Sequence, residues 1–209
     1  MKESKAMSVK ENPTAEWLFW DDFEEDNLHK YFEYTHAEKY YRSRGDGIGG
    51  STGLRVDFKE GDVEAGSLKL AFGRTHDDSY CKSVAAAGEY ITEIYSRYYV
   101  RYDEDWEGGG GDKMSRFTAL HDGWAQSMIA HTWSMGDCLG LDPASGIDIN
   151  DSGTKLVTRK YNDFDRLAWQ GAKPSKTPIF DAKHIGQWYA AETHIKLNTP
   201  GKSDGVFEL

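Results

Sequence analysis

Four segments of the chain present polar or ionisable side chains, mostly on the strand face opposite their apolar residues. Such sets can hold an anion and move a proton, because lysine and arginine neutralise negative charge while histidine, tyrosine or lysine transfer protons. The candidates, in chain order, are Glu93, Arg97, Tyr99, Arg101, Lys113, Arg116, Gln126, His131, Trp133, Glu192 and His194.

Alternation assigns these side chains to faces. In residues 90–106, Ile94, Tyr98 and Val100 fall on one face, opposite a polar set made up of Glu93, Tyr95, Arg97, Tyr99 and Arg101. In residues 126–133, one face holds Ser127, His131 and Trp133. Gln126 falls on the other face, from which it reaches a cleft only at the end of the strand. In residues 188–198, one face reads Glu192, His194 and Lys196, which is typical of a strand that lines a polar cleft.

Each candidate also has an ordinary structural interpretation. Arginines on an exposed strand face are usually solvated, and a lysine beside a glycine loop is often a plain surface residue. His131, between Ala130 and Thr132, suits a hydrogen-bonded histidine within a sheet, and Glu192 with His194 suits a polar pair. An aromatic residue in a β-sandwich belongs more often to the core than to a ligand platform.

Several other kinds of site are not supported by the motifs. The stretch GGGGDKMS differs from a phosphate-binding loop because Asp112 precedes Lys113. The stretch beginning at Asp148 resembles the start of a calcium loop, but Arg159 stands where the bidentate glutamate should be. The histidines show no HxxxH spacing, no GxSxG elbow exists, and the E-x-D-x-x-E pattern of retaining glycosidases is absent.

Composition excludes further classes. The chain of 209 residues has 25 basic and 35 acidic side chains, a net charge of −10 that argues against a nucleic-acid partner. Its mean hydropathy of −0.71, with no apolar run of about 18 residues, predicts no membrane span. Seven Trp, twelve Tyr and nine Phe are too many large apolar side chains for a disordered chain.

The elements expected to position the candidates are short strands separated by glycine turns. Residues 1–16 are polar, lack the apolar segment of a secretory signal and are predicted to be a flexible leader, with structure starting at Trp17. Strands are expected at 17–23, 54–58, 67–73, 90–106, 114–120, 126–133, 155–161 and 188–198. A long loop that includes residues 142–153 is expected between the strands at 126–133 and 155–161. This pattern, with 22 glycines and no βαβ rhythm, predicts an all-β sandwich or jelly roll. Cys81 and Cys138 are predicted to be free buried thiols, although a pair remains open.

Three stretches carry a family resemblance: DDFE near the start, RYYVRYDEDWEGGGGDKMSR, and WYAAETHIKLNTPGKSDG. Together they resemble the polysaccharide lyase-like proteins of the concanavalin A-like jelly-roll class, near polysaccharide lyase families 14 and 20, the alginate and glucuronan lyases. The resemblance runs from about Phe19 to the last residue and implies two bent antiparallel sheets over residues 17–209, the concave one forming a substrate cleft. Lys113 matches the family lysine that points into that cleft.

The resemblance implies cleavage of an acidic, uronic-acid-containing polysaccharide by β-elimination. Lys113 and Arg97 would neutralise the uronate carboxylate, and His131 or Tyr99 would transfer the proton. The residues expected to bind substrate in the same cleft are Glu93, Arg101, Arg116, Gln126, Trp133, Glu192 and His194. A structural Ca²⁺ held by Asp22 or Glu24 is a further expectation, as is secretion.

Such proteins continue with further strands after KLNTPGKSDG, whereas this chain stops at GVFEL. We therefore expect a jelly roll that lacks its C-terminal strands and self-associates through an exposed sheet edge. Two other functions stay open, a non-catalytic carbohydrate-binding module on the same scaffold and a purely structural fragment. The sequence does not identify the uronic acid, the endo or exo mode, or the oligomeric state.

Overall fold

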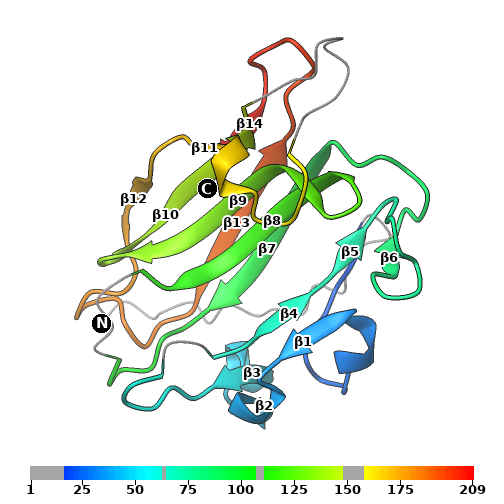
Figure 1. Ribbon diagram of the computed structural model, residues 1–209. Coiled ribbons are helices and arrows are strands. Elements are labelled where there is room, and N and C mark those ends of the chain that lie inside the picture. Colours follow the sequence, from blue (N-terminus) through cyan, green and yellow to red (C-terminus); the bar gives the residue numbers. More distant parts are fainter. Residues whose placement is uncertain (1–16, 63–64, 107–110, 148–157) are drawn as a thin grey trace. The chain divides into compact units, whose positions relative to one another are not determined.

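The computed structural model describes residues 17–62, 65–106, 111–147 and 158–209 (Figure 1). The chain divides into two compact units, residues 1–91 and residues 92–209. Strands dominate both units, and the helices within the described ranges are 3-10 turns of three residues each. The predicted all-β class is therefore confirmed. No helix in these ranges combines the length and the apolar character that crossing a membrane requires. The expected leader, residues 1–16, lies outside the described residues.

The first unit is built from three two-stranded pairings. Strand β1 (Glu33–Thr35) pairs with β4 (Ser67–Lys69), and β2 (Tyr40–Arg44) pairs with β3 (Thr52–Val56), both antiparallel. Strand β5 (Ala71–Phe72) pairs with β6 (Ser83–Ala85) in parallel. The 3-10 turns η1 (Leu28–Lys30), η2 (Ala37–Lys39) and η3 (Ile48–Gly50) connect these elements. Before β4, Gly66 has φ of +94°, and a Cβ there would lie 2.2 Å from the Thr35 carbonyl oxygen, so glycine is required.

The strand expected at residues 17–23 does not form. Asp21 instead folds the segment on itself, because its carboxylate accepts hydrogen bonds from the Phe23 backbone N–H at 2.9 Å, Asn27 Nδ2 at 3.2 Å and the Tyr31 hydroxyl at 3.0 Å. Phe23 also has φ of 59°, which no strand residue adopts. A side chain that satisfies local backbone donors competes with strand pairing, and here it prevails.

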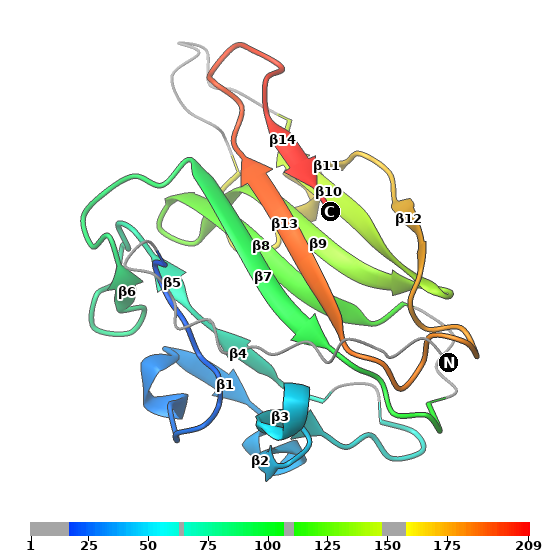
Figure 2. The same ribbon diagram turned by 180° about the vertical axis from the view of Figure 1, so that it is seen from behind.

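The second unit contains two sheets, and both views show them as separate layers (Figures 1 and 2). One has the order β14–β13–β7, from β7 (Glu93–Val100), β13 (Tyr189–Lys196) and β14 (Val206–Glu208). The other has the order β11–β10–β9–β8, from β8 (Lys113–Asp122), β9 (Ala125–Met135), β10 (Cys138–Gly146) and β11 (Leu167–Trp169). Strand β12 (Lys173–Pro178) also pairs with β10, and η4 (Phe164–Arg166) precedes β11.

The two sheets of this unit pack through alternating apolar side chains. Leu139 of β10, Ala191 of β13 and Ile179 form a buried cluster, against which Tyr98 of β7 and Met114 of β8 are packed. The Tyr98 hydroxyl lies 3.4 Å from Thr132 Oγ1 of β9, so Tyr98 and Thr132 point into the same interlayer space. The alternation expected for residues 90–106 and 188–198 follows from this packing, because the neighbours of Tyr98 and Ala191 must face outward.

A smaller core lies on the other side of the β8–β11 sheet. Ile129, Ala144 and Leu167 form it, on three adjacent strands. The segment before β11 is fixed to this face by Thr158, whose buried hydroxyl donates to the Gln126 carbonyl at 2.7 Å. The β8–β11 sheet is therefore covered on part of both faces.

Register shifts between β8 and β9 change which residues share a face. Lys113 pairs with Trp133 and Ser115 with Thr132, which leaves Met114 as an additional residue in β8. Ala119 pairs with Met128 and Leu120 with Gln126, which leaves Ser127 as an additional residue in β9. Each β-bulge reverses the alternation beyond it.

Three expected boundaries were wrong in this unit. The strand expected at 90–106 is shorter, because β7 covers Glu93–Val100. The stretch from Asp142 to Gly146, expected as part of a long loop, belongs to β10, which is paired with β9 on one side and with β11 and β12 on the other. Pro143 and Gly146 argued against a strand, but pairing on both edges overrode that local preference. The strand expected at 155–161 lies partly outside the described residues, and its described part, 158–161, is not a strand.

The two cysteines are free thiols. Cys81 is buried and Cys138 is half-buried. Burial raises the pKa of the Cys81 thiol, which keeps it protonated and unreactive at neutral pH.

We expect the smaller core to stabilise the second unit strongly. Replacing Ile129, which is 0% exposed, by Ala should lower the free energy of unfolding by about 2–5 kcal/mol, because lost burial and a new cavity add. The matched control is Ile147→Ala, at a position 53% exposed, which should cost less than about 0.5 kcal/mol. Urea unfolding measures both, and equal effects would contradict the assigned core.

Candidate functional site

The face of the β8–β11 sheet that points away from β7 and β13 gathers two cations, a histidine and two indoles. Across the β8–β9 ladder, Arg116 pairs with His131 and Lys113 with Trp133, and paired residues project to the same side. Trp169 reaches this face from β11, where it pairs with Ala144. Lys113, Arg116, His131, Trp133 and Trp169 are called the Lys113 cluster below. Lys113 and Arg116 are three residues apart, so in a regular strand they would point to opposite faces. The β-bulge at Met114 places both on the same face.

Neither cation of the cluster has a carboxylate within ion-pair distance in the described part of the chain. Lys113 is exposed, and its Nζ lies 5.2 Å from the centroid of the Trp133 ring. The half-buried Arg116 donates from Nε to Thr118 Oγ1 at 3.2 Å and from Nη2 to Asn162 Oδ1 at 2.8 Å. Its Cζ lies 5.0 Å from the Tyr161 ring centroid. Two positive charges beside one another without an acid favour an anionic ligand.

His131 lies at the centre of the cluster and is 3% exposed. Its ring is stacked on Trp169 at 5.7 Å and meets the edge of Trp133 at 5.2 Å. Both of its ring nitrogens and the Trp133 Nε1 are buried without a hydrogen-bond partner among the described residues. Removal from water, and then the charges of Arg116 and Lys113, lower the pKa of His131 to about 4. The imidazole is therefore neutral at physiological pH, with one nitrogen able to accept a proton.

Gln126 lies on the same side of the sheet, contrary to the strict alternation expected from the sequence. The bulge at Ser127 reverses the alternation, and Gln126 Oε1 accepts the Asn162 backbone N–H at 2.6 Å. Gln126 is 0% exposed, so it does not present its amide to a ligand at the surface.

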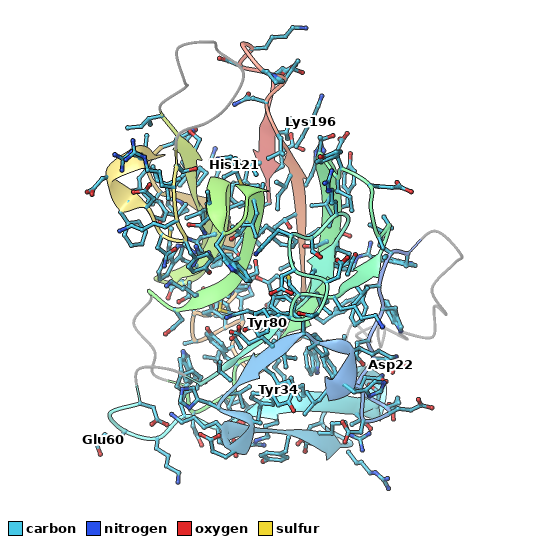
Figure 3. The ribbon with its side chains drawn as sticks, turned by 45° about the vertical axis from the view of Figure 1, so that its right-hand side comes forward. Asp22, Tyr34, Glu60, Tyr80, His121 and Lys196 are labelled. Atoms are coloured by element: carbon cyan, nitrogen blue, oxygen red, sulfur yellow. The ribbon has the colours of Figure 1, made fainter. Side chains whose placement is uncertain are left out.

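Most of the other predicted site residues lie on the β14–β13–β7 sheet. Arg97 of β7 donates from Nε to Glu192 of β13 at 2.5 Å. His194 Nε2 lies 2.7 Å from Glu93 Oε1, and His194 Nδ1 lies 3.2 Å from Glu208 Oε2 of β14. Tyr95 stacks on the His194 ring at 4.2 Å. We call Glu93, Tyr95, His194 and Glu208 the His194 network; Lys196 extends from the same strand β13 (Figure 3).

The expected convergence of all candidates in one cleft is not what the structure shows. Arg97, Tyr99, Glu192 and His194 alternate with the packed residues Tyr98 and Ala191, so they face outward from the β7–β13–β14 sheet. The Lys113 cluster alternates with Thr132, so it faces outward from the opposite layer. Alternation along each strand correctly predicted that these side chains lie opposite the apolar face. It gives no information on which of the two sheets a strand joins. Arg101, just after β7, packs its guanidinium 5.1 Å from the Trp188 ring centroid.

The two residues expected to hold calcium lie in the first unit. Asp22 is exposed (Figure 3) and accepts the Glu24 backbone N–H at 3.2 Å. Both oxygens of Glu24 accept from Thr52, one from its backbone N–H and one from its hydroxyl, each at 2.7 Å, and these bonds lower the pKa of Glu24. Among the described residues no group of three or more His, Cys, Asp or Glu is placed to hold a metal ion. The calcium site stays a prediction.

Sequence reasoning missed three contributors to the cluster. Trp169 is the last residue of β11, a strand of three residues that is too short to show alternation, and its side chain is 42% exposed. Tyr161 and Asn162 lie in a turn, and Asn162 has φ of 55°. The available signal was the tripeptide Tyr161–Asn162–Asp163, because Asn and Asp favour turns and tolerate left-handed backbone.

Comparisons with models of known protein families, with curated proteins and with solved structures found no match to this chain. The chemistry of the site therefore rests on the contacts of its own residues.

The His194 network predicts a pH-dependent tie between β7, β13 and β14. Hydrogen bonds to Glu93 and then to Glu208 raise the pKa of His194 above its usual 6.5. Its contribution to stability is thus fully present below pH 6.5 and is lost as the pH rises through the folded-state pKa. We expect the urea midpoint to fall over this range in the wild type and to change less in His194→Gln.

An NMR titration of the imidazole checks the cause of the shift. Glu93→Gln should lower the pKa of His194 more than Glu208→Gln does, because Glu93 makes the shorter contact. A His194 pKa at or below 6.5 in the wild type would show that the network does not form.

Proposed function

We propose that this chain binds an acidic, uronate-containing polysaccharide at the Lys113 cluster and cleaves it by β-elimination. The observation that carries the proposal is a pair of cations, Lys113 and Arg116, that have no carboxylate partner among the described residues and lie beside the neutral His131 and an exposed indole. The resemblance to polysaccharide lyases supports it, and so do the two packed sheets of residues 92–209, which suit a jelly-roll scaffold.

The cluster has groups for each requirement of sugar binding. Trp169, 42% exposed, offers a flat apolar surface on which the face of a pyranose ring packs. Lys113 and Arg116 would bind the carboxylate at C5 of the uronate. Charge-assisted hydrogen bonds of this type are stronger than hydrogen bonds between neutral groups. Trp133 Nε1 and the ring N–H of His131 have no partner within the described part of the chain, and they are donors that sugar hydroxyls or ring oxygens would satisfy.

The elimination follows from the same residues. The cations withdraw charge from the carboxylate and so acidify the proton on C5. The unprotonated nitrogen of His131 takes that proton, and the C5–H electron pair becomes the C4=C5 double bond. The C4–O4 bond breaks with its electrons on O4, which leaves as a hydroxyl after gaining a proton. Tyr161, whose ring centroid lies 5.0 Å from Arg116 Cζ, is the candidate proton donor.

Binding without cleavage is the second candidate, and the burial of His131 favours it. At 3% exposure, between two indoles, the imidazole is reached only if Trp169 moves. If Trp169 stays in place, the cluster is a binding surface whose histidine serves only to support the indoles.

The role of the cations is tested by Lys113→Gln and Arg116→Gln. Each should weaken binding of alginate or glucuronan, measured by calorimetry, by about tenfold or more, because a charged hydrogen bond contributes about 1.5–3 kcal/mol. Lys202→Gln, in the turn before β14, is the control and should bind like the wild type. Unchanged affinity in both cluster variants would contradict the proposal.

Cleavage and binding are separated by His131→Gln. The ultraviolet absorbance of the new C4=C5 double bond should rise with the wild type and stay flat with the variant, whereas the affinity changes little. In the wild type the rate should increase with pH through a pKa between about 4 and 6.5, because the bound carboxylate offsets the two cations. Binding of uronate polymers with no absorbance change in the wild type would select the binding function.

A further inference from the structure

Gln126 joins the sheet to the turn that follows the undescribed segment 148–157. Its side chain is fully buried, and its Oε1 accepts the Asn162 backbone N–H at 2.6 Å. Its backbone carbonyl accepts the Thr158 hydroxyl at 2.7 Å. Two hydrogen bonds from one residue of β9 therefore hold both ends of the stretch 158–162 against the outward face of the sheet.

The turn itself is fixed by Asp163. This carboxylate is 1% exposed, accepts the Arg159 backbone N–H at 2.9 Å and lies 3.3 Å from Arg166 Nη1. These bonds lower the pKa of Asp163, so it stays ionised and keeps both contacts at neutral pH. The conformation of Asn162, with φ of 55°, is thus determined by its neighbours on both sides.

The fixed Asn162 side chain in turn orients Arg116. Its Oδ1 accepts from Arg116 Nη2 at 2.8 Å, while Thr118 Oγ1 accepts from Arg116 Nε at 3.2 Å. A guanidinium is planar and carries five N–H groups, so two bonds fix its plane and leave three donors. No carboxylate of the described residues takes those three.

We infer that Gln126 and Asn162 are positioning residues that orient the Arg116 guanidinium for a carboxylate on the bound sugar, so that the site selects uronates over neutral hexoses. The inference rests on the proposed function. The selectivity arises because an oriented guanidinium loses less conformational entropy when it pairs with a carboxylate. A neutral hydroxymethyl group gains little from the same orientation.

The test compares a uronate polymer, either polyguluronate or polyglucuronate, with the same polymer after its carboxylates have been reduced to neutral hydroxymethyl groups. Asn162→Gly removes the acceptor and tolerates positive φ. It should weaken binding of the charged polymer by about tenfold and leave binding of the reduced polymer unchanged. Asn198→Gly is the matched control, since it also removes a side-chain acceptor, here of the Gly205 N–H at 2.7 Å. A merely structural role for Asn162 would weaken binding of both polymers alike, and that result would overturn the inference.

A second measurement needs no ligand. In the wild type, the Nη protons of Arg116 should give resolved NMR signals, because the hydrogen bond to Asn162 slows rotation of the guanidinium; Asn162→Gly should remove them. Gln126→Met, which lacks the acceptor for Asn162, should also remove them, and Gln126→Glu, which retains an acceptor oxygen, should restore them. Signals that persist in Asn162→Gly and Gln126→Met would overturn the positioning role.

The two readouts separate failure of the inference from failure of the proposed function. If the wild type binds no uronate polymer, the proposed function is wrong and selectivity falls with it, and the NMR signals alone decide whether Gln126 and Asn162 orient Arg116. If the wild type binds and Asn162→Gly binds equally well, the function stands and the inference falls.

Discussion

The packing of Tyr98 and Ala191 against Met114 and Leu139 is the constraint on which the second unit depends. It turns one face of each sheet inward, and alternation then sends the charged side chains of both sheets outward, away from one another. The same constraint that forms the core thus creates two separate polar surfaces. The His194 network on one of them is balanced, since its imidazole lies between two carboxylates. The Lys113 cluster on the other is unbalanced.

That imbalance stands out in a chain whose net charge is −10. Acids outnumber bases, yet Lys113 and Arg116 lie beside His131 with no carboxylate in ion-pair contact in the described ranges. The two neighbouring cations repel one another, and they disfavour protonation of the buried imidazole, which costs stability as the pH falls below 6.5. Buried polar groups without partners cost more. Features that cost stability in this way are typical of sites that become satisfied only when a ligand binds.

Local patterns predicted the all-β class and the outward faces of β7 and β13, because each of those strands alternates without interruption. They failed where a side chain or a neighbouring strand overrode alternation. The Asp21 carboxylate accepts the Phe23 backbone N–H, and no strand forms there. Pro143 belongs to β10 because neighbouring strands pair with both edges of β10. Gln126 was assigned to the wrong face because a bulge at Ser127 depends on the partner strand, which the sequence of β9 does not contain. Lys113, Arg116, His131 and Trp133 were named as candidates, but Trp169 and Asn162 enter through contacts distant in sequence.

The bulge at Met114 also bears on how this segment can change over evolutionary time. Lys113 and Arg116 share a face because three steps along β8 are matched by two along β9. The count of residues between them therefore matters more than what those residues are. Deleting Met114 would remove the bulge and leave both cations on one face, two positions apart, whereas inserting one residue would turn one of the two cations toward the core. We expect relatives that keep the cluster to vary the side chain at position 114 among apolar types, or to lack this residue, but not to gain a residue between the two cations.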